Sequence, residues 1–310
     1  MNKRKRGCGC ILNIIVLVII VFGVFQIQGA IIPHVRNFIQ KNLLDDNSAI
    51  TLRNEINSEH AILVDLSTGK VICEKECEKQ TYPASLTKIM TTILAIENIS
   101  DLNSKVILPK SIFNNLYSDN ASMAGFLPNE KVKATDILYG TILPSGAEAA
   151  ESLALYISGS EDKFVRLMNK KAKDLGMANT HFTNPIGLHN TDHYTTVSDL
   201  AKLLEYALQN DTFKEIFTAS KFSTSKTNKH PNGITFYSTM FQSMSPVEFD
   251  GGKIIGGKTG YTEEAGLCLA SLAEKDGKEY LLITTGASGS HETEQYDLTD
   301  ALYIYSNYLP

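Results

Sequence analysis

The order of apolar and polar residues divides this chain into regions with strand-like and helix-like spacing. Strand-like runs rich in β-branched residues occur near the start of the sequence, at residues 61–75, and near its end, at residues 251–261 and 266–287. Gly69 and Gly277 lie inside the first and last of these runs, among turn-forming residues. The pattern therefore predicts a hairpin at the beginning of the folded region, and a strand followed by a second hairpin at its end.

The region between these strands has helical spacing. Apolar residues recur at helical intervals in the segments 85–99, 133–143, 147–157, 161–176 and 197–210, and again after the last strand, in 292–309. Strands at both ends of a domain, with helices between them, favour a single antiparallel sheet covered by helices. We therefore predict an α+β fold in which the N- and C-terminal segments build one antiparallel sheet flanked by helices, with a mostly helical lobe inserted.

The first 58 residues follow a third pattern. Basic residues at positions 3–6 precede an apolar run from Ile11 to Phe25, which is extended by Ala30 to Ile32, and basic flanks stay on the cytoplasmic side of a membrane. The run falls between the ~10–14 apolar residues of a signal peptide and the ~18 of a spanning helix, and no convincing cleavage site follows it. We therefore predict a cytoplasmic basic tail at 1–10, a transmembrane signal-anchor at 11–32, a polar stalk at 33–58 and a folded extracytoplasmic domain at 59–310.

Charge and composition narrow the class of protein. The chain has 310 residues, of which 43 % are hydrophobic, as expected of a globular protein. Its formal net charge is −5, and because the four basic residues at positions 3–6 contribute +4, the remainder sums to −9. This acidity argues against a nucleic-acid partner.

The cysteines and histidines do not indicate a metal or redox site. The domain predicted to be exported holds three cysteines, Cys73, Cys77 and Cys268, and an odd number does not suggest a disulfide framework. We interpret the first two as structural. His189 and His193 have a ligand-like spacing, but they lie in a Gly/Asn/Thr/Asp-rich segment that reads as a loop and not as a zinc site.

One polar pair stands out because it lies in an apolar helix. A Ser-x-x-Lys spacing is expected about once by chance in 300 residues, and this chain has four. Three are explained by a hairpin turn, a helix cap and a polar loop: Ser67/Lys70, Ser160/Lys163 and Ser223/Lys226. The fourth, Ser85/Lys88, begins the segment 85–99, whose other positions are mostly apolar, so that its lysine is expected to be buried.

The position of Ser85 suits nucleophilic chemistry. Pro83 is typical of a helix start, where the positive end of the helix dipole favours negative charge near the serine oxygen. Residues three apart share a helix face, and a desolvated lysine with a lowered pKa can accept the hydroxyl proton. Taken alone, the pair is about as compatible with a structural role, in which Ser85 caps the helix and Lys88 reaches solvent, as with a catalytic role.

Two further motifs supply polar groups. Lys258-Thr259-Gly260 lies on a predicted strand, where an ammonium and a hydroxyl suit a carboxylate ligand and the glycine lets a substrate backbone approach. Ser145 lies in a turn between two apolar helices, and by itself it reads best as a helix N-cap.

In this order, the three motifs resemble those of the serine D-alanyl-D-alanine carboxypeptidases among the low-molecular-mass penicillin-binding proteins. The resemblance covers residue 60 to the C-terminus in six ordered blocks, such as PASLTKIMT and GGKTGYTEEAG, and it implies a β-lactamase/transpeptidase-like fold. The implied roles are Ser85 as nucleophile, Lys88 as its base, Ser145 as proton relay, Lys258, Thr259 and Gly260 as the binding site of the substrate carboxylate, and the backbone N–H groups of Ser85 and Tyr261 as oxyanion hole.

The resemblance implies removal of the terminal D-alanine from peptidoglycan stem peptides through an acyl-enzyme, with no metal or cofactor, and acylation of the same serine by β-lactams. Two departures stand out: Ala147 occupies the position of the motif asparagine, and only about 50 residues follow Lys258. The shortness leads us to expect the N-terminal helix to be the membrane tether in place of a C-terminal one. Ala147 leaves open the alternative of a catalytically impaired penicillin-binding or sensory protein, whereas a β-lactamase is disfavoured because no Glu-x-x-x-Asn block is convincing.

Overall fold

The computed structural model describes residues 48–310. The predicted basic tail, the signal-anchor and most of the predicted stalk lie in residues 1–47, outside the described residues. Among residues 48–310, no helix combines the length and the apolar character that crossing a membrane requires.

A sheet joins the two ends of the domain. In the described residues it has seven strands in the order β1-β3-β2-β11-β10-β9-β8, and all neighbours are antiparallel except β1 and β3. The strands are β1 (Ile50–Thr51), β2 (His60–Asp65), β3 (Lys70–Lys75), β8 (Glu248–Phe249), β9 (Gly252–Thr262), β10 (Gly266–Lys275) and β11 (Lys278–Ala287). Strand β2 pairs directly with β11, which confirms that segments from both ends build one sheet. Gly69 and Gly277 form the two hairpin turns with φ of 70° and 73°.

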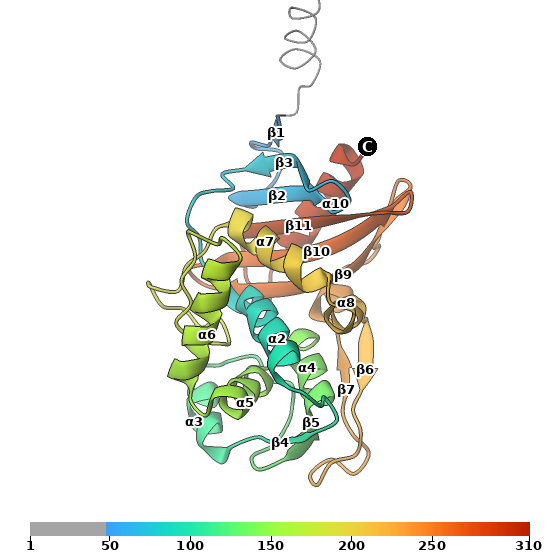
Figure 1. Cartoon of the computed structure of the whole chain (residues 1–310). Coiled ribbons are helices and arrows are strands. Elements are labelled where there is room, and N and C mark those ends of the chain that lie inside the picture. Colours follow the sequence, from blue (N-terminus) through green and yellow to red (C-terminus); the bar gives the residue numbers. More distant parts are fainter. Residues whose placement is uncertain (1–47) are drawn as a thin grey trace, which may run out of the picture. The chain divides into compact units, whose positions relative to one another are not determined.

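Helices cover both faces of this sheet (Figure 1). They are α2 (Thr87–Asn98), α3 (Lys110–Ser118), α4 (Ala134–Ile142), α5 (Ala147–Ser158), α6 (Glu161–Asp174), α7 (Val197–Leu208), α8 (Asp211–Thr218), α9 (Thr239–Ser243) and α10 (Tyr296–Tyr308). Helix α10 buries Ile304 and Tyr305 on one face, in a core shared with β10 and β11. Helices α2, α7 and α8 contribute to a second core on the other face.

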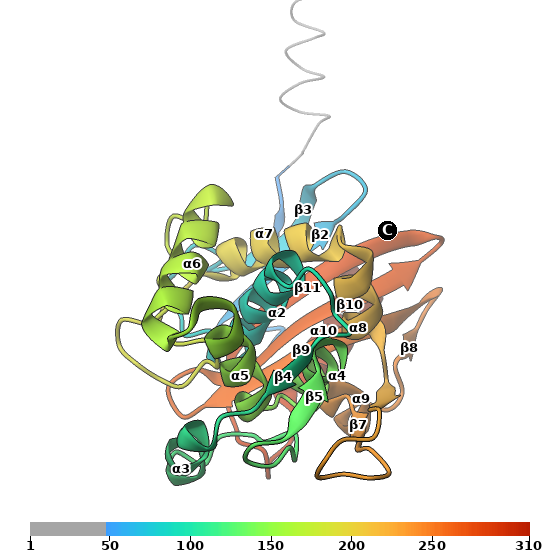
Figure 2. The ribbon, with the colours of Figure 1, turned by 60° about the horizontal axis from the view of Figure 1, so that its bottom comes forward.

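The helical lobe is inserted between the first and last strands, as predicted (Figure 2). It also holds two short strand pairs, β4 (Lys105–Ile107) with β5 (Lys131–Lys133), and β6 (Lys221–Ser223) with β7 (Thr235–Tyr237). Helix α2 joins the two parts of the domain because Ile89 and Ile93 belong to the core under the sheet, while Ala95 belongs to the core of the lobe. The start of α2 therefore lies at the junction of sheet and lobe.

The predicted boundary between stalk and domain is wrong. Residues 50–58 were assigned to the stalk, but Ile50 pairs with Cys73 of β3, and Leu52 and Ile56 are buried in the core beside α10. The Asp300 carboxylate accepts hydrogen bonds from the backbone N–H groups of Asn57 and Ser58. These contacts make the segment part of the domain, which begins near residue 49.

Candidate active site

The predicted nucleophile lies where α2 begins. Ser85 is in a short 3₁₀ turn, η2 (Ala84–Leu86), which leads into α2, whereas we predicted that Ser85 would be in the first α-helical turn. Leu86 is fully buried, and Ala84 has a φ of 44°, a conformation that residues other than glycine rarely adopt. The neighbours of Ser85 on both sides are therefore buried, which fixes the turn. The side chain of Ser85 itself is half-buried and lines a cleft.

Two recesses of this cleft meet at Ser85. The first, which we name the serine recess, has a volume of about 170 Å³ and is lined by Ser85, Ser122, Ser145, Thr239, Thr259 and Tyr261, among others. The second, named the lysine recess, has a volume of about 370 Å³, and its lining includes Ser85, Lys88, Asp119, Ala147, Ile186 and Tyr261. The structure thus brings together residues from all three sequence motifs.

Lys88 is placed to exchange a proton with Ser85. Its ammonium donates hydrogen bonds to the Oγ atom of Ser85, at 3.0 Å, and to the carbonyl oxygen of Ile186, at 2.7 Å. The side chain is buried, and burial lowers the pKa of Lys88 to about 7, although the nearby Glu148 carboxylate opposes the shift. Near neutral pH a substantial fraction of Lys88 is therefore an uncharged amine, which can act as a base.

Ser145 lies in the turn between α4 and α5, as expected. Its φ of 62° is unusual for a residue with a side chain, and its buried Oγ atom has no hydrogen-bond partner in the described residues. The following residue has to be glycine, because a Cβ atom on Gly146 would lie 2.6 Å from the Cβ atom of Ala124 and 2.7 Å from the carbonyl oxygen of Gly140. This tightly fixed turn aims an unpartnered hydroxyl at the serine recess.

Strand β9 forms another wall of the cleft. It pairs with β10 along its length but with β8 only at Gly252 and Lys253, so its second edge has no strand partner beside the site in residues 48–310. The Thr259 hydroxyl lines the serine recess and shares a 2.7 Å hydrogen bond with the hydroxyl of Thr239. An open strand edge can pair with an extended peptide.

The structure places Lys258 deeper than the sequence suggested. It is fully buried, lines neither recess, and donates a hydrogen bond to the carbonyl oxygen of Thr259. Side chains alternate along a strand, so Lys258 shares a face of β9 with Gly260, which packs against the turn that holds Ser85. Burial and the charge of Lys88 hold the pKa of Lys258 well below its ordinary value.

Gly260 brings β9 against the nucleophile. A Cβ atom at this position would lie 3.1 Å from the backbone nitrogen of Ser85 and 3.3 Å from the Cβ atom of Ala84. We predicted that this glycine lets a substrate backbone approach, and the turn of Ser85 also requires it. Ser85 and Tyr261, whose N–H groups are the predicted oxyanion hole, are therefore on segments in direct contact.

At the position of the motif asparagine, Ala147 offers no side-chain hydrogen bond to Lys88. Ala147 is buried, lines the lysine recess and packs with Leu116, Ala150 and Ile186. Besides the Ser85 hydroxyl, the acceptor of the Lys88 hydrogen bonds is the Ile186 carbonyl. A backbone group from a distant loop thus holds Lys88.

His193 connects the loop that contains Ile186 to the start of α2 through hydrogen bonds. Its Nδ1 atom accepts the backbone N–H of Thr183 at 3.0 Å, so its Nε2 atom carries the proton, which it donates to the Thr87 hydroxyl at 2.8 Å. Burial lowers the pKa of His193 to about 3, so the ring is neutral. Within residues 48–310, no group of three or more His, Cys, Asp or Glu side chains could hold a metal ion. By its hydrogen bonds to Thr183 and Thr87, His193 has a structural role that the sequence did not reveal.

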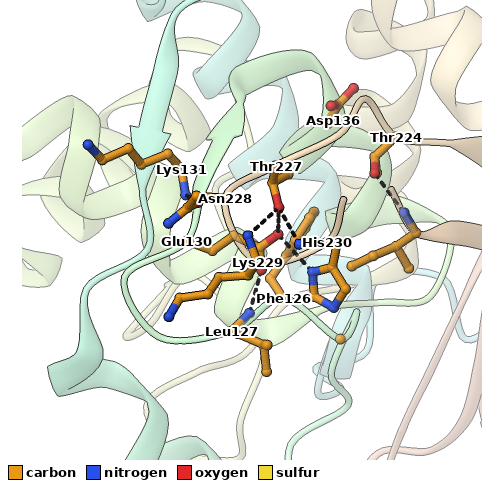
Figure 3. Close-up of polar contacts among 12 residues, drawn as sticks. Phe126, Leu127, Glu130, Lys131, Asp136, Thr224, Thr227, Asn228, Lys229 and His230 are labelled. Carbon is orange, nitrogen blue, oxygen red and sulfur yellow. Dashed lines mark hydrogen bonds and ion pairs between the residues drawn. The ribbon is translucent and has the colours of Figure 1, made fainter. Parts of the chain in front are cut away.

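Two buried glutamates hold the segment 122–127, which reaches the serine recess through Ser122. The Glu148 carboxylate accepts three backbone N–H groups of this segment at 2.9–3.1 Å. Glu130 accepts the next N–H, that of Leu127, with one oxygen, and contacts Thr227 and His230 with the other (Figure 3). The second contact ties the β6–β7 loop to the wall of the site.

The chain is similar in sequence to a known family. The family model of D-alanyl-D-alanine carboxypeptidases matches residues 47–289. The D-alanyl-D-alanine carboxypeptidase DacF of Bacillus subtilis is 34 % identical over 240 residues, which cover 76 % of this chain and 59 % of the Bacillus protein. A D-alanyl-D-alanine carboxypeptidase from a Streptomyces species is 33 % identical, over 75 % of this chain and 81 % of the relative. The chain thus spans less than two thirds of the Bacillus relative.

The fold is also similar to that of solved structures. The crystal structure of a Streptomyces DD-transpeptidase superimposes with a TM-score of 0.73 at 27 % sequence identity. The match covers 83 % of this chain and all of the other. This similarity confirms the predicted α+β, transpeptidase-like architecture.

Proposed function

Because the chain belongs to the D-alanyl-D-alanine carboxypeptidase family, we propose that it removes the terminal D-alanine from peptidoglycan stem peptides. The observation that carries this proposal is the 3.0 Å hydrogen bond between the buried amine of Lys88 and the hydroxyl of Ser85, at the meeting point of two recesses. A serine with a base at this distance is equipped for acyl transfer.

In the first half of the reaction, Ser85 Oγ attacks the carbonyl carbon of the penultimate D-alanine while Lys88 takes its proton. The backbone N–H groups of Ser85 and Tyr261 stabilise the oxyanion. The C–N bond then breaks, and the proton passes through Ser145 to the amine of the departing D-alanine. The unpartnered hydroxyl of Ser145 supports this relay, because it has no competing hydrogen bond within the described residues.

In the second half, water attacks the ester on Ser85 while Lys88 takes the water proton. The bond between the acyl carbon and Ser85 Oγ then breaks, Lys88 returns the proton to this oxygen, and the shortened peptide leaves with its new carboxylate. Thr259 is proposed to bind the carboxylate of the terminal D-alanine, because its hydroxyl lines the serine recess. Lys258 is buried, lines neither recess and donates a hydrogen bond to the Thr259 carbonyl, so it is proposed to position Thr259 instead of contacting the carboxylate, which departs from the role that the resemblance implied. Penicillins would acylate Ser85 by the same attack.

The impaired or sensory alternative rested on Ala147. The position of Lys88 argues against it, since the Ile186 carbonyl orients the amine without the missing amide. The relatives are carboxypeptidases by name, which also favours an enzyme.

We further propose that residues 11–32 anchor the protein in the membrane, with the catalytic domain on the extracytoplasmic side. The support is the sequence pattern of a basic tail followed by an apolar run. Peptidoglycan is itself extracytoplasmic, which agrees with this orientation.

The test combines the intact mass of the protein after penicillin treatment with an assay of D-alanine release from a pentapeptide ending in D-Ala-D-Ala. We expect a single acyl adduct that is absent in Ser85→Ala, together with D-alanine release that is also absent in this variant. An adduct without release would favour the sensory alternative. The absence of any adduct would overturn the assignment of Ser85 and Lys88.

A further inference from the structure

A third recess opens beside the cleft, on the side of the helical lobe. This side recess has a volume of about 420 Å³ and lies between α3 and the loop 184–188, with α5 also contributing to its lining. It shares Asp119, Ile186 and Leu188 with the lysine recess. The two recesses are therefore neighbours on either side of these three residues.

Helix α5 leads from one recess into the other. Ala147, at its first position, lines the lysine recess, and Glu151 and Leu155, at successive intervals of four residues, line the side recess. Residues four apart share a helix face and are about 6 Å apart along the axis. Figures 1 and 2 both show α3, α5 and α6 on the same side of the helical lobe. This face of α5 therefore runs from the lysine recess, which Ser85 and Ala147 line, toward Glu151 in the side recess.

The side recess holds a carboxylate that lacks a partner. Glu151 is only 8 % exposed, yet its carboxylate makes no hydrogen bond or ion pair within the described residues. Burial, together with the charge of Glu161 at the edge of the recess, raises the pKa of Glu151 to about 8. Burial disfavours the ionised form of this acid, and a bound cation would supply the counter-charge that stabilises the carboxylate.

The remaining lining matches an aliphatic cation. Ile112, Leu116 and Leu155 provide apolar surface, and Asp119 adds a carboxylate near the junction with the lysine recess. No lysine, arginine or histidine lines this recess in the described part of the chain. Apolar walls with acidic groups suit a methylene chain that ends in an ammonium group.

The direction of the substrate follows from the two sides of Ser85. Thr259 lies in the serine recess, so the departing D-alanine occupies that side. The residues on the acyl side then extend through the lysine recess toward Glu151. We propose that the side recess binds an ammonium group on the aliphatic side chain of the residue that precedes the two D-alanines. This inference rests on the proposed carboxypeptidase function.

The experiment compares two tripeptides on the full chain, Nα-acetyl-lysyl-D-alanyl-D-alanine with a free ε-amine and its Nα,Nε-diacetyl form. We expect kcat/KM for D-alanine release to be higher by about tenfold with the free amine, because hydrogen bonds to charged groups contribute this much or more. In Glu151→Gln the ratio should fall to about one. The ratio of two substrates on one protein cancels any loss of folded enzyme.

A matched control removes an equal charge far from the recess. Glu248 is exposed on β8, and Glu248→Gln should keep the tenfold preference. Equal kcat/KM values for the two peptides in the unmodified protein, or a preference that survives Glu151→Gln, would overturn the subsite and leave the proposed function intact. No release from either peptide would instead overturn the proposed function itself.

Discussion

At the scale of single residues, the site depends on two lysine side chains withdrawn from water. Lys88 and Lys258 are both buried, and burial is the main cause that lowers the pKa of each. Lys88 is hydrogen-bonded to the nucleophile, and the nearby Glu148 carboxylate raises its pKa and so opposes the effect of burial. Lys258 has Lys88 as its electrostatic neighbour, and the charge of Lys88 lowers the pKa of Lys258 further.

This arrangement predicts a pH dependence for acylation. Only the neutral form of Lys88 can accept the Ser85 proton, so the rate constant for penicillin acylation should rise about tenfold per pH unit below pH 7 and level off above it. The measurement is the acylation rate between pH 5 and pH 9, followed by intact mass. A rate that is constant across this range, or that levels off only near pH 10, would contradict a lowered pKa of Lys88.

Gly260 provides a second test at the residue scale. In Gly260→Ala the new methyl group meets the backbone of the Ser85 turn at 3.1 Å, so the strand or the nucleophile has to shift. Misplacement by a fraction of an ångström to 1 Å predicts a loss of kcat/KM of about 10²-fold. The matched control is Gly277→Asn, in an exposed turn with a φ of 73°, which should retain full activity. Full activity of Gly260→Ala would show that the close approach is unimportant.

At the scale of secondary-structure elements, strong periodicity made the fold predictable. All six predicted helices and both hairpins are present within a few residues of their expected bounds. The short elements were missed, among them α3, α9 and the pairs β4–β5 and β6–β7, because pieces of three to nine residues carry too little pattern. The motif residues Ser85, Lys88, Ser145 and Thr259 do meet in one cleft.

The groups contributed by loops were not predictable in the same way. The Ile186 carbonyl that holds Lys88 is a backbone atom, and no side-chain pattern marks it. His193 was noticed only for its spacing from His189, although its role depends on distant partners on α2 and at residue 183. Such contacts depend on the packing of segments far apart in sequence.

The loop held by His193 can be tested directly. In His193→Phe the buried N–H of Thr183 and the hydroxyl of Thr87 lose their partner, which should lower the free energy of unfolding by about 2–4 kcal/mol. Because the same loop positions Lys88, kcat/KM should fall more than the folded fraction does. Denaturant unfolding and D-alanine release measure the two effects. The exposed His181 offers a control, since His181→Phe should change stability by no more than about 0.5 kcal/mol.

At the scale of the whole molecule, the first residues of the domain pack against its last helix. Strand β1 extends the sheet beyond β3, and the following segment packs beside α10, the last helix. A pattern of scattered apolar residues looked like a stalk because only Leu52 and Ile56 face the core, too few to show a period. The C-terminal helix is thus covered by the segment that enters the domain.

This contact between the first residues and the last helix predicts how far the domain can be shortened at its N-terminal end. A protein of residues 49–310 should unfold cooperatively, whereas one of residues 60–310 loses two buried side chains and the partners of Asp300. Burying a leucine or isoleucine contributes about 1.5–3 kcal/mol, so the shorter protein should be less stable by roughly 3–6 kcal/mol. Urea unfolding of both measures the difference, with the double variant Leu52→Ala/Ile56→Ala in residues 49–310 as the matched control for burial alone. Equal free energies of unfolding for the two proteins would show that residues 49–59 belong to the stalk. If the shorter protein loses more stability than the double variant does, the additional loss comes from β1 and the Asp300 hydrogen bonds.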